Sequence, residues 1–161
     1  PAVSIRAVAS RCSVSAGTIY NYYESKADLL SDTIESIWHE IFFHPEDEQV
    51  FHDVESCISW IYERLEYGNR QFPGFFSLHS FGFMRDEKTS GKKRMMKTWG
   101  HILNGLCEVL GNDPKVRADV FDQEFTEKKF ADILFSLILV SMIRQDYDPS
   151  SVLMLVKKTL Y

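Results

Sequence analysis

Apolar residues recur at intervals of three and four along most of this sequence, which is the spacing of an amphipathic helix. The longest stripes lie in residues 26–43, 51–65, 95–110, 127–145 and 149–161. No stretch alternates apolar and polar residues convincingly enough to predict a strand. The pattern therefore predicts an all-α protein built from several helices.

Two shorter helical patterns lie close together near the start of the chain. The first, over residues 4–11, carries an apolar stripe at i, i+3 and i+4, and the second covers residues 16–22 with Ile19 facing inward. Ser15 directly precedes the second pattern and is a candidate N-cap. Only residues 12–15 separate the two, so the spacing predicts a tight helix-turn-helix.

The second of these short helices carries no charged side chain and is rich in small and hydroxyl-bearing residues. Such groups can lie close to a phosphate backbone and donate hydrogen bonds to it, while neighbouring side chains reach base edges in the major groove. The composition of this helix therefore favours contact with DNA.

The helix-turn-helix segment also resembles a known family. Residues 9–30 read ASRCSVSAGTIYNYYESKADLL. They resemble the signature of the TetR family of bacterial transcriptional repressors, in which Ala-x-x-x-Gly-Val-Ser precedes x-Gly-Thr-Leu-Tyr-x-Tyr-Phe-x-Ser-Lys-x-x-Leu-Leu. The sequence departs from the signature at Ser13, where the family usually has Gly, and Ser can adopt a strained turn only at some cost. Beyond Leu30 the resemblance is one of helical layout.

The resemblance implies a function and a set of partners. It implies a cytoplasmic, homodimeric transcriptional repressor that binds a palindromic operator in double-stranded DNA and is released by a small apolar or amphipathic ligand. The alternative is a regulator of the same fold that is controlled by a protein partner and has no small-molecule inducer. Neither interpretation calls for a cofactor.

The candidate DNA-contacting residues follow from the resemblance and from the chemistry of each side chain. Short donors and cations at helix starts are assigned to phosphates: Ser4, Arg6 and Lys26. Residues of the second helix are assigned to the DNA backbone or to thymine methyl groups: Ser15, Thr18, Tyr20 and Tyr22. Three residues are expected to face base edges: Ala16, Gly17 and Asn21. The Asn21 amide can pair with adenine.

The family's DNA-binding domain has three helices, and the first is expected roughly 15 to 20 residues before Ser4. The sequence begins at Pro1, inside the connection to the second helix, so we expect this chain to lack the first one. One wall of the small core would then be missing. The residues expected in that core are Ile5, Val8, Val14 and Ile19.

Cap residues and a proline set the expected boundaries of the longer helices. Ser25, Thr126 and Asp148 are candidate N-caps, the last followed by Pro149 at the first helical position. Pro45 ends the linking helix, because it excludes helical geometry at the residue before it. We therefore expect a DNA-binding domain with its linking helix over residues 1–43, and a ligand-binding and dimerisation domain over residues 44–161.

The helix expected over residues 127–145 is apolar nearly all round. A helix on the surface of a monomer needs only one apolar stripe, so two stripes suggest that one packs on its own subunit and the other on a partner. A central helix of one larger core is the alternative. The resemblance favours a dimer, because the last two helices of the family form a four-helix interface with their symmetry mates. The expected interface residues are Phe130, Leu134, Leu137, Ile138, Ser141, Leu153 and Val156.

Aromatic residues and methionines gather in the middle of the chain. Such side chains can form an adaptable pocket for an apolar or cationic ligand, although any single one of them belongs more often to the core. Regulators of the family generally respond to small molecules, which favours a pocket. The expected lining residues are Trp60, Phe76, His79, Phe83, Met96, Trp99 and Leu103.

Charge and cysteine content change this picture little. The net charge of −5 argues against nucleic acid, but residues 1–26 carry Arg6, Arg11 and Lys26 against Glu24 alone. The three cysteines are odd in number and widely spaced, as in reduced thiols of a cytoplasmic protein. Histidines and carboxylates near residues 39–53 match no metal-ligand spacing, and no phosphate loop or nucleophile motif occurs. We therefore expect neither a metal site nor an enzyme.

Overall fold

The computed structural model describes residues 4–43, 50–76 and 90–161, with the side chains of residues 90–98 left aside. Every regular element in these ranges is helical, which confirms the all-α prediction. The helices are α1 (Ile5–Arg11), α2 (Ala16–Tyr20), α3 (Lys26–Phe42), α4 (Val54–Gln71), α6 (Ser90–Asn112), α7 (Glu127–Arg144) and α8 (Ser150–Leu160).

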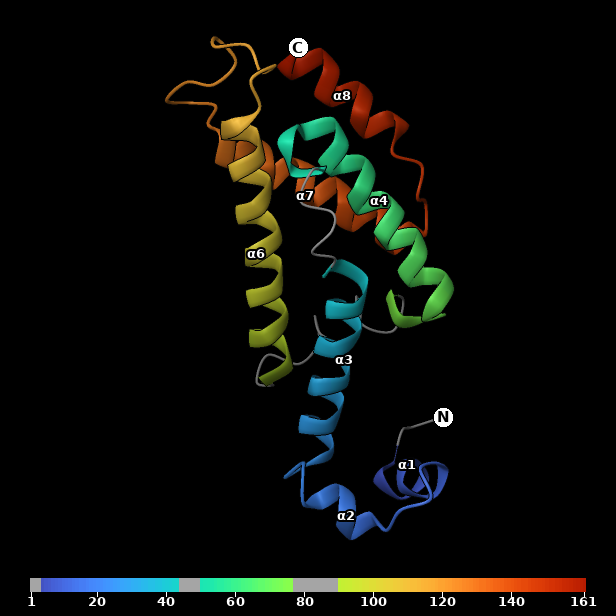
Figure 1. The fold of residues 1–161 in the computed structure, drawn as a ribbon. Coiled ribbons are helices and arrows are strands. Elements are labelled where there is room, and N and C mark those ends of the chain that lie inside the picture. The colour runs from blue at the N-terminus through green and yellow to red at the C-terminus, as the bar shows by residue number, and fades with distance from the viewer. Residues whose placement is uncertain (1–3, 44–49, 77–89) are drawn as a thin grey trace.

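The helices form a small unit and a larger body that α3 connects (Figure 1). Helices α1 and α2 lie together at one end of the molecule, and α3 runs from them toward the body. In the body, α6 packs against α3, α4 and α7, while α4 also packs against α3 and α8. The chain ends beside the tip of the body farthest from α1 and α2 (Figure 1).

Side-chain oxygens at the N-caps start most of these helices by accepting an otherwise unpaired backbone N–H. The caps and the residues whose N–H they accept are Ser4 with Ala7, Ser15 with Thr18, Ser25 with Asp28, Asp53 with Ser56, and Thr126 with Lys129. The predicted caps Ser15, Ser25 and Thr126 are confirmed.

The predicted start of the last helix is wrong by one residue. Helix α8 begins at Ser150, with Pro149 in the cap position and no side-chain cap. Asp148 Oδ1 still accepts the N–H of Ser150 at 2.9 Å, as an Asp does in a turn that leads into a helix.

Two separate clusters of buried residues support these helices. The small one joins α1 to α2 through Ile5, Ala9 and Ile19, with the half-buried Leu29 of α3 packed against it. The expectation that Val14 belongs to this core is wrong, because its side chain is 42% exposed. Its backbone N–H instead bonds the carbonyl of Ala9 at 3.0 Å and closes the turn after α1.

The larger cluster fills the body and includes part of α3. Trp38 and Ile41 of α3 are buried among residues of α4, α6, α7 and α8. Gly68 of α4 permits the close approach of α3, since a Cβ at this position would lie 2.7 Å from Ile41 Cδ1 and 3.0 Å from Phe76 Cζ. The C-terminal half of α3 is therefore packed into the core of the body.

Helix α7 has two apolar faces, as the sequence predicted, but the assignment of residues to those faces is partly wrong. Phe130, Leu134 and Ile138 of α7 and Val156 of α8 are at most 4% exposed within the single chain, so they pack in its own core. Ser141 also faces its own subunit, because its hydroxyl lies 2.9 Å from the Tyr62 hydroxyl of α4. The large apolar side chains that α7 and α8 leave exposed are Ile133, Val140, Ile143, Met154 and Leu155.

Candidate nucleic-acid interface and ligand pocket

The turn between α1 and α2 sets the angle at which α2 is presented. Ser13 has a φ of 56°, a left-handed conformation that a residue with a Cβ adopts at a cost. Two backbone bonds hold this turn, from Ser13 N–H to the carbonyl of Ser10 at 3.3 Å and from Val14 N–H to the carbonyl of Ala9 at 3.0 Å. The strained turn expected at Ser13 is therefore present.

Helix α2 is anchored on one side and exposed on the other. Ile19 is 8% exposed and fixes the inner side against Ile5 and Ala9. The remaining residues of α2 and its C-terminal end are exposed, apart from the half-buried Ala16. The exposed residues are Gly17, Thr18, Tyr20, Asn21 and Tyr22. Most of the residues predicted to meet the bases thus lie on one exposed segment around α2.

Hydroxyl groups order the beginning of α2. Ser15 Oγ accepts the N–H of Thr18 at 3.1 Å and lies 2.9 Å from Thr18 Oγ1. The cap therefore uses both the Ser15 oxygen and the Thr18 hydroxyl, so these two residues are positioned before any partner arrives.

A further contact, which the sequence did not predict, ties the segment after α2 to α3. The Tyr23 hydroxyl donates a hydrogen bond to Asp32 Oδ2 at 3.0 Å. This bond and the nearby carboxylate charge raise the pKa of Tyr23, because both favour the protonated phenol. No helical spacing links residues 23 and 32, and the pairing becomes visible only when the turn into α3 is built.

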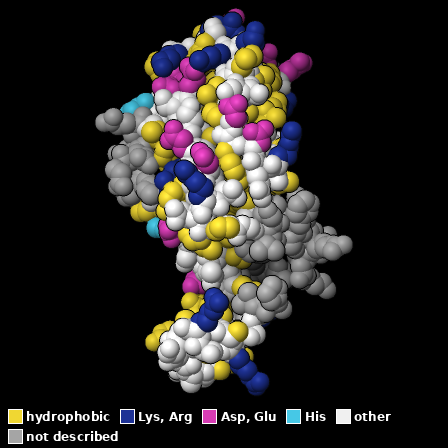
Figure 2. Space-filling model, turned by 90° about the vertical axis from the view of Figure 1, so that its right-hand side faces the viewer, with side chains coloured by type: hydrophobic (Ala, Val, Ile, Leu, Met, Phe, Trp, Pro, Cys, Tyr) yellow, Lys and Arg dark blue, Asp and Glu magenta, His cyan; other side chains and the backbone are white. Residues whose placement is uncertain are grey.

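Three exposed cations lie near this surface, together with the exposed carboxylate of Glu24. Arg6, Arg11 and Lys26 are exposed, at the two ends of α1 and at the start of α3. Figure 2 shows dark-blue side chains on the small unit at the bottom of the view, while Asp and Glu side chains gather higher up. A phosphate backbone that follows α2 would meet these cations, despite the negative net charge of the whole chain.

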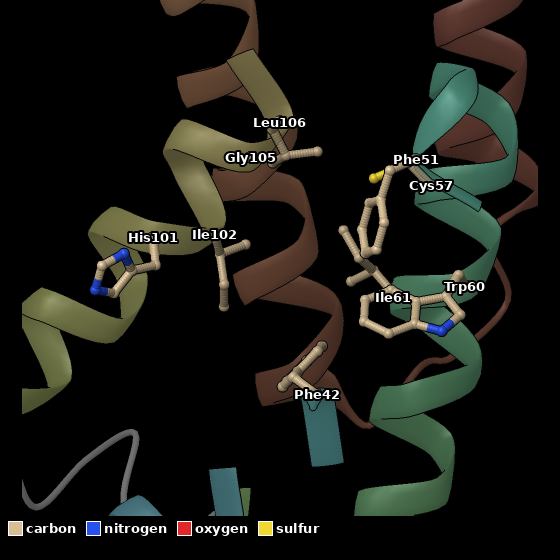
Figure 3. Close-up of a pocket in the computed structure, with 9 residues that line it drawn as sticks. All are labelled: Phe42, Phe51, Cys57, Trp60, Ile61, His101, Ile102, Gly105 and Leu106. Carbon is tan, nitrogen blue, oxygen red and sulfur yellow. The ribbon is translucent and has the colours of Figure 1, made fainter. Parts of the chain in front are cut away.

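A pocket of about 270 Å³ lies in the body between α4 and α6 (Figure 3). In Figure 3, Ile102 and Leu106 of α6 face Phe51, Trp60 and Ile61 across this space. The remaining residues that line it are Phe42, Cys57, His101 and Gly105. No lining residue of this pocket is a Lys, Arg, Asp or Glu.

The pocket wall is aromatic, and its one thiol is buried and uncharged. The Trp60 ring meets the Phe51 ring edge-on at 5.2 Å and the Phe42 ring edge-on at 5.9 Å. Burial raises the pKa of the Cys57 thiol to about 12, with a smaller contribution from the Asp53 carboxylate. The thiol therefore stays neutral at physiological pH, and the pocket suits an uncharged apolar ligand.

The predicted ligand-binding residues are only partly brought together. Trp60 lines the pocket, whereas Leu103 is half-buried against the core and Trp99 packs edge-on against Phe135 at 5.8 Å. Phe76 does not line this pocket, because it is 1% exposed and packs on Trp38 in the core. The side chains of His79, Phe83 and Met96 lie outside the described part of the chain.

One helix reaches both candidate sites. Lys26 begins α3 beside α2, and Phe42 ends it in the wall of the pocket. Phe42 stacks on Trp38 of the same helix at 5.7 Å. The pocket therefore borders the far end of the helix that carries the α1–α2 unit.

The described residues contain no group of three or more His, Cys, Asp or Glu side chains placed to hold a metal ion. Across residues 4–43, 50–76 and 90–161, no helix is long and apolar enough to cross a membrane.

The N-terminal part of the chain matches a known protein family. Residues 1–33 match the model of the bacterial regulatory proteins of the tetR family. The matched stretch contains α1, α2 and the start of α3. No curated protein and no solved structure matches the chain.

Proposed function

Because the chain belongs to the tetR family of bacterial regulatory proteins, and is thus a DNA-binding transcriptional regulator, we propose that it is a cytoplasmic repressor. A small apolar ligand releases it from a palindromic operator. The observation that carries the proposal is the exposed, uncharged segment around α2, flanked by Arg6, Arg11 and Lys26. This arrangement suits a helix that enters the major groove while cations beside it hold phosphates.

The residues of the small unit divide into two roles in this proposal. Ser4, Arg6 and Lys26 hold phosphates and set the register of the protein on the duplex. The exposed side chains of α2 and Asn21 then read the bases, since the cap at Ser15 fixes where α2 points. Asn21 makes no side-chain hydrogen bond within the described residues, so its amide is available to adenine.

Two copies of the chain are needed to read a palindrome. The outer faces of α7 and α8 support such a pairing, because Ile133, Val140, Met154 and Leu155 are between 37% and 57% exposed in the single chain. A contiguous exposed apolar surface often marks a site of protein–protein contact. We propose that the symmetry mate covers it, with Leu137 and Leu153 at the edge of the contact.

The ligand acts through α3. A molecule between α4 and α6 displaces Phe42 and tilts α3, which moves the α1–α2 unit of each subunit away from the half-site spacing of about 34 Å. Such a ligand shifts the equilibrium only by the difference between its affinities for the two states. The alternative of control by a protein partner needs no pocket, so the 270 Å³ space at this place supports the ligand-responsive proposal.

The experiment is a selection of duplexes from a random-sequence pool, followed by binding measurements with two variants. Lys26→Ala should weaken binding to all selected duplexes alike and reduce the dependence of log K on log salt by about one unit per site. Asn21→Ala should change the selected sequence and cost about 1–3 kcal/mol of discrimination at one base pair. Lys128→Ala, which removes an exposed cation from α7, is the matched control and should change neither. Failure of the wild-type protein to enrich any duplex would refute the proposed function.

A further inference from the structure

The surface that α2 presents has an unusual chemistry for reading bases. Residues 12–23 contain no charged side chain. The commonest specific contact to guanine is a bidentate Arg or Lys in the major groove, and this stretch offers neither. The side chain in it that can form a bidentate pair is Asn21, and its base partner is adenine.

The cations elsewhere in the small unit are not placed to contact guanine in the major groove. Arg6 and Arg11 belong to α1, and in a helix-turn-helix the first helix crosses the phosphate backbone. Lys26 is the first residue of α3, after the turn that leaves α2. Their positions suit phosphate contacts, so base reading is left to the uncharged residues between them.

Thr18 offers its methyl group to a partner. It is exposed, its N–H bonds Ser15 Oγ at 3.1 Å, and its hydroxyl lies 2.9 Å from the same oxygen. The polar atoms of Thr18 are therefore engaged in the cap, and the Cγ2 methyl is the group that remains. Threonine methyls pack against the C5 methyl of thymine in the major groove.

Gly17 allows a close approach on the same surface. A Cβ at this position would meet only Ser15 Oγ, at 3.6 Å, which is an ordinary contact. The chain itself therefore does not require glycine, although glycine costs about 1 kcal/mol relative to alanine inside a helix. The space left by the absent side chain would let a base edge approach α2 beside Thr18.

From these four observations we propose that α2 reads its half-site through thymine methyl groups, with Thr18 as the main reader, and through one adenine at Asn21. The half-site is accordingly centred on A·T pairs, and guanine is not read by α2. This inference rests on the proposed DNA-binding function and names the class of sequence that the regulator selects.

The test uses the full chain and the duplexes enriched from a random-sequence pool. Each thymine of the best duplex is replaced by uracil, which removes the C5 methyl and leaves pairing unchanged. The loss of one buried methyl should weaken binding about fourfold, which corresponds to about 0.8 kcal/mol. The same duplexes are then measured with Thr18→Ser, which keeps the hydroxyl for the Ser15 cap and removes only the methyl.

The two changes should not add. Thr18→Ser should bind the thymine duplex about fourfold more weakly than the wild type and lose nothing more on the duplex with uracil at the contacted position. Additive losses would show that Thr18 does not touch that methyl. Equal affinities of the wild type for thymine and uracil duplexes would overturn the inference. Enriched half-sites centred on G·C pairs would overturn it as well. In each of these outcomes the protein still selects DNA, so the proposed function survives. The absence of any enriched duplex would refute both the proposed function and this inference.

Discussion

The α1–α2 unit and the helical body carry function in different ways. The small unit is held by a few buried residues, and its candidate DNA contacts are exposed side chains on a short segment. The body is held by a large core shared among α3, α4, α6, α7 and α8, and its pocket is a space that this core leaves between two helices. A local sequence pattern can specify the first kind of site, whereas the second depends on how distant helices pack.

The largest expected effect concerns the helical body, and it separates dimer formation from the folding of one subunit. Val140→Glu places a charge on the exposed face of α7, where the side chain is 48% exposed in the single chain. If the symmetry mate covers this face, the buried and unpaired carboxylate should cost about 3–5 kcal/mol and yield monomers. Sedimentation velocity measures the change, with Lys128→Glu, an exposed position in the first turn of α7, as control. A dimer that persists in Val140→Glu would place the interface elsewhere.

The next effect compares neighbouring residues on the two faces of α7. Leu134 is fully buried, so Leu134→Ala should lower the free energy of unfolding by about 2–5 kcal/mol through lost burial and a residual cavity. Ile133 is 44% exposed in the single chain, so Ile133→Ala should cost much less within one subunit. Urea denaturation at low protein concentration gives both values. Equal losses would mean that both faces of α7 are buried in one subunit, as the alternative of a single larger core requires.

These residues also show where sequence reasoning reached its limit. The helices and the caps at Ser15, Ser25 and Thr126 were predictable, because capping and apolar periodicity are local properties. On α7 the spacing of apolar residues could not show which face packs in the core, because a helix that is apolar all round has no polar side to mark the outside. Leu134 and Ile138 were therefore assigned to a partner although they pack in their own core.

The pocket was harder to predict for a related reason. Aromatic composition located an apolar region, but it could not distinguish Phe76, which fills the core, from Phe42, which lines the pocket. Phe76 lies at the close approach of α3 and α4, where its Cζ would be 3.0 Å from a Cβ added at Gly68. The candidate DNA contacts needed no such information, because almost all of them lie within residues 15–26, and the turn at Ser13 and the buried Ile19 suffice to expose them.

A smaller effect tests whether the body controls the small unit. Ile102→Trp should fill the pocket and weaken the binding of N-phenyl-1-naphthylamine, an uncharged aromatic dye, at least tenfold, because the added ring occupies the same space. DNA affinity without ligand should change little. Asn104→Trp is the matched control, since Asn104 is exposed on the same helix and does not line the pocket. Dye binding that is equal in the two variants would exclude this pocket as the ligand site.

The most direct test of the central claim, that the exposed segment around α2 serves DNA and not the fold, is to measure stability and DNA affinity together in Gly17→Ala. Nothing in the chain opposes the added methyl, and alanine favours the helix, so stability should stay equal or rise by up to about 1 kcal/mol. The same methyl should hold the DNA away and weaken binding to every selected duplex. A variant that is as stable as the wild type but binds DNA at least tenfold more weakly is the predicted result. Unchanged DNA affinity, or a loss of affinity that accompanies unfolding, would contradict the account.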